Sequence, residues 1–399
     1  MTHFFNLNKE PFEKIAENKK NIELRLFDEK RQKVNIGDKI IFTCKEDNNN
    51  ILSVIVTDLH KFESFEELYK NLDLTKCGYS HEEIGSACAK DMEKYYTKSQ
   101  IKKYGVLGIE FRKAMPNDNF NCGLVLEGGG IRALYSSGVL DAFLENNIEF
   151  PYVIGVSAGS CNGVSFLGKN INRMKNITIE YSCDEKYKSI KSLFKNGEYL
   201  NSKWIFGELT YDIYPLDYDA YDKSNAVLCA VTTNAKTGRP EYFYPKDFRN
   251  ECEVLRASCA LPIATNPVPL GKDVYYDGGI TDSIPLKKAF DDGCKKCVVI
   301  LTQDKTYVKK PMGHERVICK ILKKYPLTAE KVLTRHIMYN KQREYVFEQE
   351  NLGNALVICP PKPLNCSTLN VTTEQQKEIY DIGYKQGLEY IDRVKEFLK

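Results

Sequence analysis

One serine stands between glycines in the arrangement that activates a hydroxyl for nucleophilic attack. The segment Gly155-Val-Ser157-Ala-Gly159 has the form G-x-S-x-G and directly follows the apolar run Tyr152–Ile154. In this form the serine occupies a strained turn from a strand into a helix, where flanking side chains would clash, so glycine stands on both sides. The turn exposes the Ser157 hydroxyl. A tight turn with an incidental serine has the same sequence, so the rest of the chain must decide between the two.

A run of three glycines lies upstream of this serine and follows another apolar run, Leu124–Leu126. Successive glycines let backbone N–H groups point at an oxyanion, which an acyl-transfer transition state requires. A flexible turn or a nucleotide-phosphate loop is the alternative. The phosphate loop is disfavoured because neither G-x-G-x-x-G nor G-x-x-x-x-G-K-[ST] is complete. The residues of the expected oxyanion loop are Gly128, Gly129, Gly130, Ile131 and Arg132.

A third segment, Tyr276-Asp277-Gly278-Gly279, puts a carboxylate directly before two glycines at the end of the run Val274–Tyr276. Taken alone, Asp-Gly-Gly is more often a turn than a catalytic base. Its value therefore depends on what surrounds it.

The elements that must position these segments alternate between strand and helix. Val139–Leu144 has helical spacing, and a long charged helix is expected at Thr373–Leu398. Such alternation predicts a largely parallel sheet with helices on both faces, which is an α/β domain. The buried-strand candidates are Leu124–Leu126, Tyr152–Ile154, Ala226–Val231 and Val298–Leu301.

A different organisation is expected before this domain. Gly37-Asp38 punctuates the chain, Asp47–Asn50 indicates a hairpin loop, and Ser64 followed by Glu67 is a helix-capping pair. Between Phe65 and Tyr104 the pattern turns helical. We expect a small β-barrel or curled sheet with inserted helices. The strand candidates are Ile22–Phe27, Lys39–Cys44, Ile51–Leu59 and Val106–Arg112.

The boundary between the two units is expected where Pro, Asp and Asn cluster after Lys113, because these residues favour loops. The sequence thus predicts a first domain at residues 1–113, a linker at 114–121 and a second domain at 122–399.

The glycine run, the G-x-S-x-G segment and Asp277-Gly-Gly, in this order, resemble the patatin-like phospholipase family. Leu261-Pro262, Pro267 and Asp282-Ser-Ile-Pro285 extend the resemblance, which covers most of residues 122–310 and favours the bacterial, soluble branch. It implies a three-layer α/β/α hydrolase fold and a Ser–Asp dyad, with Ser157 as nucleophile and Asp277 as general base. It also implies an oxyanion loop at the three glycines, lipid esters as substrates and no cofactor or metal.

Two positions depart from the family pattern: Glu127 replaces its usual Asp, and Ala133 stands where Gly is common. Neither change removes an N–H donor. Only five histidines exist, and a Ser–Asp–His triad would have to use His314 or His336, which follow Asp277 in chain order. His314 lies in a charged loop and His336 in a basic helical pattern, so the dyad is favoured over the triad.

The first unit resembles the ASCH domain, whose barrel is related to the PUA fold. The resemblance rests on the segment Lys19–Arg25, on the Gly37-Asp38 turn and on the end strand Tyr104–Glu110. It implies a cleft for RNA or a nucleotide. The candidate cleft residues are Lys20, Glu23 and Arg25. An ion pair at the rim of the barrel is an equally good interpretation of Glu23 and Arg25.

Two further features have competing interpretations. Ten of the 41 residues from Tyr181 to Tyr221 are aromatic, including the only tryptophan, Trp204. Core packing is the favoured reason, and the alternative is a lid that lines an acyl groove or enters a lipid surface. Cys294-Lys-Lys-Cys297 has no second Cys/His pair at zinc spacing, so packing between a helix and a strand is favoured over a metal or redox site.

Composition excludes several classes of protein. A formal net charge of +3 gives no general electrostatic hold on nucleic acid or on an anionic membrane. The chain has no uninterrupted apolar stretch of about 18 residues, so we expect no membrane span. We also expect no secretory signal. The 14 cysteines, scattered through a long chain, favour reduced thiols in the cytoplasm. The lipid substrate that the resemblance implies would bring transient, peripheral contact with a membrane or micelle surface.

The sequence therefore predicts a serine acyl hydrolase of the phospholipase A type, with an ASCH module that binds RNA or a nucleotide. One alternative is an RNA- or nucleotide-binding regulatory protein with a minor hydrolase activity. Another is a soluble carboxylesterase or thioesterase that uses the same machinery.

Overall fold

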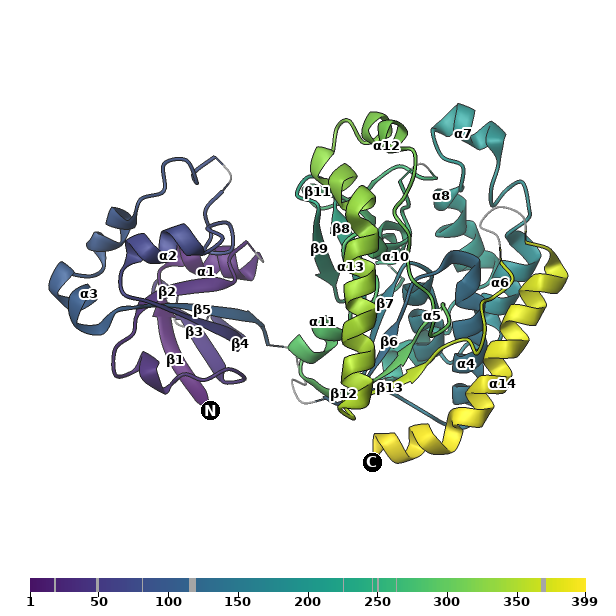
Figure 1. Ribbon diagram of the computed structural model, residues 1–399, viewed down its shortest axis with the longest axis horizontal. Coiled ribbons are helices and arrows are strands. Elements are labelled where there is room, and N and C mark those ends of the chain that lie inside the picture. Colours follow the sequence, from purple (N-terminus) through teal and green to yellow (C-terminus); the bar gives the residue numbers. More distant parts are fainter. Residues whose placement is uncertain are drawn as a thin grey trace. The chain divides into compact units, whose positions relative to one another are not determined.

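The computed structural model describes the chain except for residues 18, 48, 49, 81, 115–119, 225, 246, 250, 263 and 367–370. It divides into two compact units, Met1–Asp118 and Asn119–Lys399 (Figure 1). Most of the expected linker at 114–121 lies outside the described residues.

The first unit is a curled five-stranded sheet with helices in its connections. Its strand order is β1-β3-β4-β5-β2, with β1 parallel to β3 and the other pairs antiparallel. Three of the four predicted strands begin and end within one residue of their expected bounds, and β4 runs three residues further. Helix α2 is capped by Ser64 as expected. The elements are β1 (Thr2–Leu7), α1 (Lys9–Ala16), β2 (Ile22–Leu26), β3 (Lys39–Cys44), β4 (Ile51–Phe62), α2 (Phe65–Asn71), α3 (Lys98–Tyr104) and β5 (Val106–Lys113).

The sequence did not predict strand β1 or helix α1. Alternate residues of β1 are buried, but one of them is His3, which interrupts the apolar alternation that would have indicated a strand. β3 and β4 form the expected antiparallel pair, and Asn48 and Asn49 of the predicted hairpin loop lie outside the described residues.

The second unit is a three-layer α/β/α domain, as predicted. Its elements are β6 (Phe120–Leu126), α4 (Ala133–Glu145), β7 (Tyr152–Val156), α5 (Ala158–Leu167), α6 (Arg173–Tyr181), α7 (Ile190–Asn196), α8 (Ser202–Ile205), α9 (Tyr218–Lys223), β8 (Val227–Asn234), β9 (Arg239–Phe243), α10 (Cys252–Ser258), β10 (Val268–Leu270), β11 (Asp273–Asp277), α11 (Leu286–Asp291), β12 (Cys294–Ile300), α12 (Glu315–Ile321), α13 (Pro326–Asn351), β13 (Ala355–Ile358) and α14 (Thr373–Leu398).

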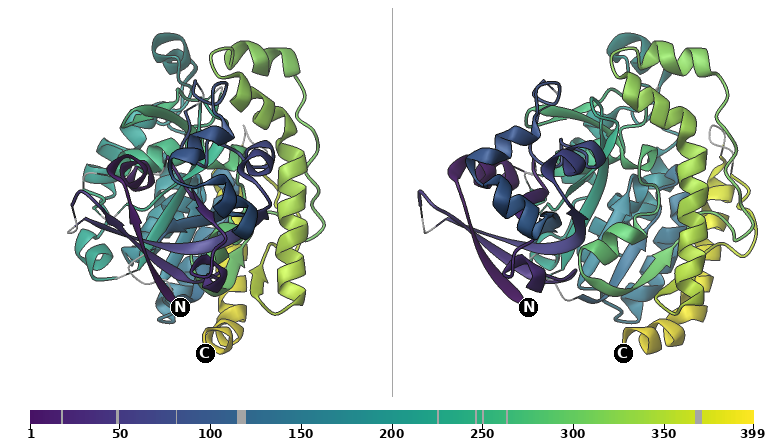
Figure 2. Two further views of the ribbon diagram at one scale, coloured as in Figure 1. Left: turned by 90° about the vertical axis from the view of Figure 1, so that its left-hand side faces the viewer. Right: turned by 60° about the vertical axis from the view of Figure 1, so that its left-hand side comes forward.

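Five neighbouring strands of the second sheet are parallel, in the order β8-β7-β6-β12-β13. The antiparallel strands β11 and β10 extend the β8 end, and β9 also pairs with β8. Helices cover both faces, with α4, α5 and α14 on one and α11 and α13 on the other (Figures 1 and 2). Because both faces are covered, the strands are nearly continuous runs of apolar residues.

The strand register brings the three predicted segments to one edge of the sheet. Leu126 at the end of β6 pairs with Gly155 of β7, so the glycine run and the serine turn leave the sheet as neighbours. Asp277 ends β11 opposite Thr232 of β8. Since β8 lies directly beside β7, the Asp277 carboxylate approaches Ser157 from the side of the turn opposite the glycine run.

Strand β12 begins earlier than expected, at Cys294 instead of Val298. Cys294 and Cys297 therefore lie within a strand and not between a helix and a strand. Both thiols pack against Gly123 of β6, where a Cβ atom would lie 2.6 Å from the Cys294 sulfur. None of the helices in the described part of the chain is long and apolar enough to cross a membrane.

Candidate active site

Ser157 occupies a strained turn between β7 and α5. Its backbone has φ 55° and ψ −129°, a conformation that non-glycine residues avoid unless the surrounding structure holds them there. The flanking glycines make the turn possible. A Cβ at Gly155 would lie 2.6 Å from the carbonyl oxygen of Gly159, and a Cβ at Gly159 would lie 2.6 Å from that of Leu126. The steric reason for G-x-S-x-G is thus present at both positions.

A second serine, Ser258, helps hold the turn. Its hydroxyl accepts a hydrogen bond from the Ser157 amide at 2.9 Å and donates to the Val231 carbonyl at 2.7 Å. Ser258 is fully buried at the end of α10, so it links that helix, β8 and the nucleophile turn. The sequence analysis did not identify Ser258, and no local motif distinguishes it.

Asp277 is buried, with 2% of its surface exposed. Its Oδ1 accepts a hydrogen bond from the Gly279 amide at 2.7 Å, whereas Oδ2 has no hydrogen-bond partner within the described residues. Burial raises the pKa of this carboxyl, and the Ser157 hydroxyl, the Arg335 charge and the Gly279 amide oppose the rise without cancelling it. A carboxylate with a raised pKa is a better base for an alcohol. A hydrogen bond between a hydroxyl and its base that is long without substrate, as here between Ser157 and Asp277, tightens as the reaction begins.

The glycine loop touches the serine directly. A Cβ at Gly128 would lie 3.0 Å from the Ser157 Cβ, and one at Gly129 would lie 2.8 Å from the Thr302 hydroxyl. Among the described residues, no acceptor is found for the amides of Gly128 and Gly129. Gly130, Ile131 and Arg132 form a short 3-10 turn that leads into α4. Backbone donors are thus available beside Ser157, as stabilisation of an oxyanion there would require.

The carboxylate of Glu127 supports this loop from beneath. Glu127 is buried and accepts two hydrogen bonds of 2.6 Å, from the Thr302 amide and from the Tyr339 hydroxyl. Tyr339 belongs to α13, more than 200 residues further along the chain. Its aromatic ring could have been assigned to the core from sequence, but its role as a hydrogen-bond donor could not.

Three cations, one of them Arg132 of the loop itself, lie near the glycine loop and Asp277. Arg335, on the same face of α13 as Tyr339, donates to the Ser283 hydroxyl at 3.2 Å, and its Nη2 lies 2.7 Å from where a Gly279 Cβ would stand. Lys309 lies over the Tyr339 ring, at 5.1 Å from its centre. Burial and the charges of Arg335 and Arg132 lower the pKa of Lys309 to about 8, against an opposing effect of Glu127. Neither Lys309 nor Arg335 was predicted as a site residue.

A largely apolar cavity of about 350 Å³ opens at Ser157. The aromatic residues of the stretch at 181–221 divide between the cavity wall and the core. Tyr187, Tyr199 and Tyr218 line the cavity, whereas Tyr221 belongs to the core. The cavity is within the usual size range of small-ligand sites, about 300–1,000 Å³. Its aliphatic lining includes Ile177, Ile205, Leu209, Leu216 and Leu255.

Neither candidate histidine of a triad is hydrogen-bonded to Ser157 or Asp277 in the part of the chain that the structure describes. The His336 ring contacts the Leu333 carbonyl of its own helix at 3.2 Å. His314 is exposed at the start of α12.

In the first unit, Lys20, Glu23 and Arg25 lie together. The Glu23 carboxylate is 3.3 Å from the Lys20 ammonium and 2.9 Å from the Arg25 guanidinium. Glu23 and Arg25 are on the same strand, β2, and the side chains of Lys20 and Glu23 are buried. The Lys20 ammonium also donates to the Cys77 carbonyl at 2.8 Å. Both cations are therefore already paired with one carboxylate.

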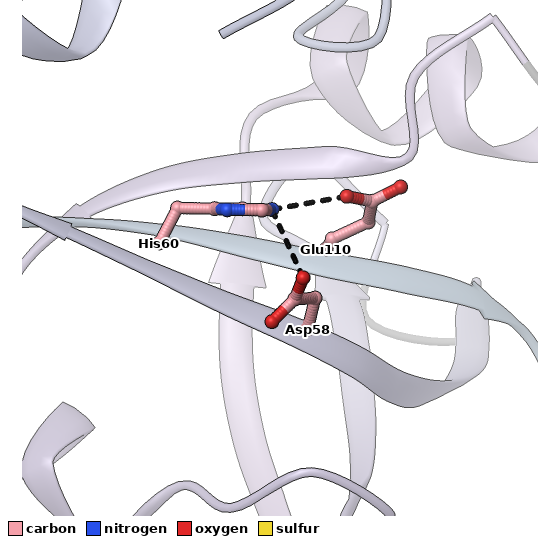
Figure 3. A group of neighbouring side chains, drawn as sticks. All are labelled: Asp58, His60 and Glu110. Atoms are coloured by element: carbon pink, nitrogen blue, oxygen red, sulfur yellow. Dashed lines mark hydrogen bonds and ion pairs between the residues drawn. The ribbon is translucent and has the colours of Figure 1, made fainter. Parts of the chain in front are cut away.

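A second charged cluster in this unit joins Asp58, His60 and Glu110 (Figure 3). The His60 Nε2 is 3.0 Å from Glu110 and 3.8 Å from Asp58. The other oxygen of Glu110 accepts a hydrogen bond from Lys76 at 2.8 Å. Burial would raise the pKa of Glu110, but the hydrogen bonds from Lys76 and His60 outweigh it and lower that pKa. The Lys76 ammonium balances the charge of the Glu110 carboxylate, so we interpret the cluster as an ion-pair network.

Family models match three parts of the chain. Residues 124–290 match the patatin-like phospholipase family, residues 5–115 match the ASCH domain, and residues 325–399 match a domain of unknown function (DUF6363). The first two matches confirm the resemblances predicted from sequence. The third covers α13 and α14, so Arg335 and Tyr339 lie outside the segment that matches the patatin-like model.

Individual relatives are more distant. The chain is 28% identical over 284 residues to the uncharacterized protein YjjU of Escherichia coli (strain K12), a match that covers 69% of this chain and 78% of that protein. The crystal structure of VipD from Legionella pneumophila is 16% identical, with a TM-score of 0.38, over 71% of this chain and 68% of that one. The solution structure of protein PF0455 from Pyrococcus furiosus is 32% identical, with a TM-score of 0.23, over 28% of this chain and 97% of that one.

Proposed function

We propose that this chain, which carries an ASCH domain followed by a patatin-like phospholipase domain, is a serine acyl hydrolase that cleaves carboxylic esters of lipids. The observation that carries the proposal is the strained Ser157 beside the buried carboxylate of Asp277, at the mouth of an apolar cavity. A core serine has no need of a strained backbone, and a structural turn has no need of a cavity.

The reaction would proceed in two steps. Asp277 accepts the proton of the Ser157 hydroxyl, whose oxygen attacks the ester carbonyl, and the amides of Gly128 and Gly129 bind the oxyanion. The tetrahedral intermediate collapses, the alcohol leaves with the proton from Asp277, and the acyl group stays on Ser157. Water then gives a proton to Asp277 and attacks the acyl-serine. When this second tetrahedral intermediate collapses, the Ser157 oxygen takes the proton back from Asp277 and the fatty acid leaves.

The surroundings of the dyad favour a lipid with an anionic head group over a neutral soluble ester. The apolar cavity suits an acyl chain, and Arg335 and Lys309 stand beside the base and the glycine loop, where the alcohol part of the ester would lie. Neither cation has a carboxylate partner within 4 Å among the described residues. A substrate phosphate would supply the missing negative charge.

The test is hydrolysis of phosphatidylglycerol dispersed in detergent, with release of fatty acid measured by mass spectrometry. We expect turnover by the wild type, a loss of at least a thousandfold in Ser157→Ala, and wild-type turnover in the control Ser224→Ala. Among the described residues, the Ser224 hydroxyl bonds the Tyr221 carbonyl and the Ala226 amide, far from the dyad in the chain. Turnover that survives in Ser157→Ala would contradict the proposed nucleophile. Turnover of short neutral esters alone would favour a carboxylesterase.

For the first unit we propose binding of RNA or a nucleotide beside Lys20, Glu23 and Arg25. The match to the ASCH domain supports this proposal, together with the two cations that the Glu23 carboxylate holds side by side. Binding of a short single-stranded RNA, followed by fluorescence anisotropy, should weaken at higher salt and in Arg25→Ala. Equal binding by the wild type and Arg25→Ala would exclude this cleft.

A further inference from the structure

The short helix α7 presents apolar side chains to solvent. Phe194 is 86% exposed and Ile190 is 66% exposed, and Leu193 is also exposed. Large apolar side chains that are this exposed are rare in groups on a protein surface unless they contact a partner. Ile190, Leu193 and Phe194 belong to neither of the two core clusters that the described residues form around the sheet, so their exposure is not explained by core packing.

The base of α7 belongs to the wall of the catalytic cavity. Lys188 and Leu200, on either side of the helix, form an antiparallel bridge, and the Ser189 amide donates to the Tyr199 carbonyl at 2.9 Å. Tyr187, Lys188, Tyr199 and Leu200 all line the cavity that opens at Ser157. The exposed apolar side chains of α7 therefore project from the wall of the cavity that opens at Ser157.

Helix α12 has the same character and adds positive charge. Val317 and Ile321, one turn apart, are about half exposed, as is the preceding Met312. The inner side of the helix packs through Ile318, which is buried. From residue 308 to 324 the chain has six basic residues and one acidic residue, in a protein whose total net charge is only +3. The exposed cations that have no ion pair in the described part of the chain include Lys310, Arg316, Lys320 and Lys323.

Helices α7 and α12 lie at the same end of the second unit, as both Figure 1 and Figure 2 show. This is the end at which the catalytic loops emerge. The parallel strands β6, β7 and β12 share one direction, so the loop that leads from β12 to α12 leaves the sheet at the edge where Ser157 stands.

We propose that α7 and α12 form a docking surface for an anionic lipid membrane, with which the protein collects its substrate. This inference rests on the proposed function and identifies where the enzyme meets lipid. The exposed apolar side chains would enter the interface between head groups and acyl chains, and the lysines and arginine would contact anionic head groups. A protein partner or a second copy of the chain would also cover apolar residues, but the excess of positive charge around them favours an anionic surface.

The surface is tested by flotation of the full-length protein with vesicles. We expect binding to vesicles of phosphatidylglycerol and phosphatidylcholine, weaker binding in high salt, and little binding to phosphatidylcholine alone. Each basic residue near an anionic membrane contributes about fivefold to partitioning, so Lys320→Glu with Lys323→Glu should reduce binding by at least tenfold. Phe194→Glu should reduce it by a similar factor, because a charged side chain replaces an apolar one at the interface.

Matched controls lie on other helices. Leu352→Glu replaces a residue that is 64% exposed at the end of α13, and Lys385→Glu reverses an exposed charge on α14. Both controls should float like the wild type. Wild-type binding by Phe194→Glu and by the double lysine variant would overturn the proposal. The proposal would also be overturned if Phe194→Glu converted a dimer to a monomer without changing vesicle binding. Helix α7 would then be a contact between two copies of the chain.

The failure of this proposal can be told apart from failure of the proposed function, since flotation requires no turnover. Wild type that hydrolyses dispersed lipid but does not float would overturn the docking surface and leave the hydrolase intact. Protein that floats as expected, yet shows no turnover, would retain the docking surface and remove the catalytic proposal.

Discussion

Replacing Asp277 by Asn should remove activity and increase stability, a combination that only a functional buried carboxylate gives. The amide has nearly the shape of the carboxyl and keeps an oxygen for the Gly279 amide, which donates at 2.7 Å. It cannot accept the Ser157 proton. General-base catalysis contributes about 10²–10⁴ in rate, so kcat/KM should fall by that factor, or about 3–5 kcal/mol at 1.36 kcal/mol per tenfold.

The stability change has the opposite sign. Burial raises the pKa of Asp277 in the folded protein, so the ionised carboxylate destabilises the fold above that pKa. The wild type therefore loses stability as the pH rises from the pKa of Asp277 in the unfolded chain to its pKa in the folded protein. We expect Asp277→Asn to unfold about 2–4 °C higher than the wild type at pH 7.5.

Two measurements test this reasoning. Hydrolysis of a lipid ester gives the loss in kcat/KM, and differential scanning calorimetry at pH 7.5 and at the lowest pH that keeps the protein folded gives the gain in Tm. The gain should shrink on acidification, because the wild-type carboxyl is then protonated and neutral. A variant that retains a tenth of the wild-type kcat/KM, or that is less stable than the wild type at pH 7.5, would refute it.

Three further changes have definite expected results. Gly159→Ala would place a Cβ 2.6 Å from a backbone oxygen, so labelling of Ser157 by a fluorophosphonate should slow at least tenfold while overpacking costs about 1–3 kcal/mol in a denaturant titration. Arg335→Met removes a charge that lowers the pKa of Asp277, so the acidic limb of the pH–rate profile should move to higher pH, and Arg335→Lys should largely restore it. Glu110→Gln removes a carboxylate whose pKa is lowered on folding, so its contribution of about 0.5–1 kcal/mol to stability is present near neutral pH and lost as the pH falls through the folded pKa. Amide hydrogens of β5 should therefore exchange faster in the variant than in the wild type at pH 7, and this difference should fade in acid.

Local sequence patterns were sufficient for the elements that carry the site. The turn at Ser157 requires glycine on both sides for steric reasons that act within five residues, so the motif and the geometry agree. The long, charged helix α14 was predicted with its observed bounds, and in the structure a capping box at Thr372 marks its start. The fold class followed from the same alternation of strands and helices.

Contacts between distant parts of the chain could not be predicted in this way. Ser258, Thr302, Tyr339 and Arg335 reach the site from α10, from the loop after β12 and from α13, and none of them belongs to a recognisable motif. Their roles depend on which side chains the parallel sheet brings together at its edge. The start of β12 at Cys294 was missed because two lysines, one exposed and one half-buried, interrupt the apolar run before Cys297.

The most direct test of the central claim is to map the residue that a fluorophosphonate modifies. The full-length protein is labelled, digested and analysed by mass spectrometry, beside Ser157→Ala and Asp277→Asn. The account predicts a single modified peptide that carries Ser157, no modification in Ser157→Ala and slow modification in Asp277→Asn, because the hydroxyl is activated by the neighbouring carboxylate. Modification of another serine, or an equal rate in Asp277→Asn, would contradict it.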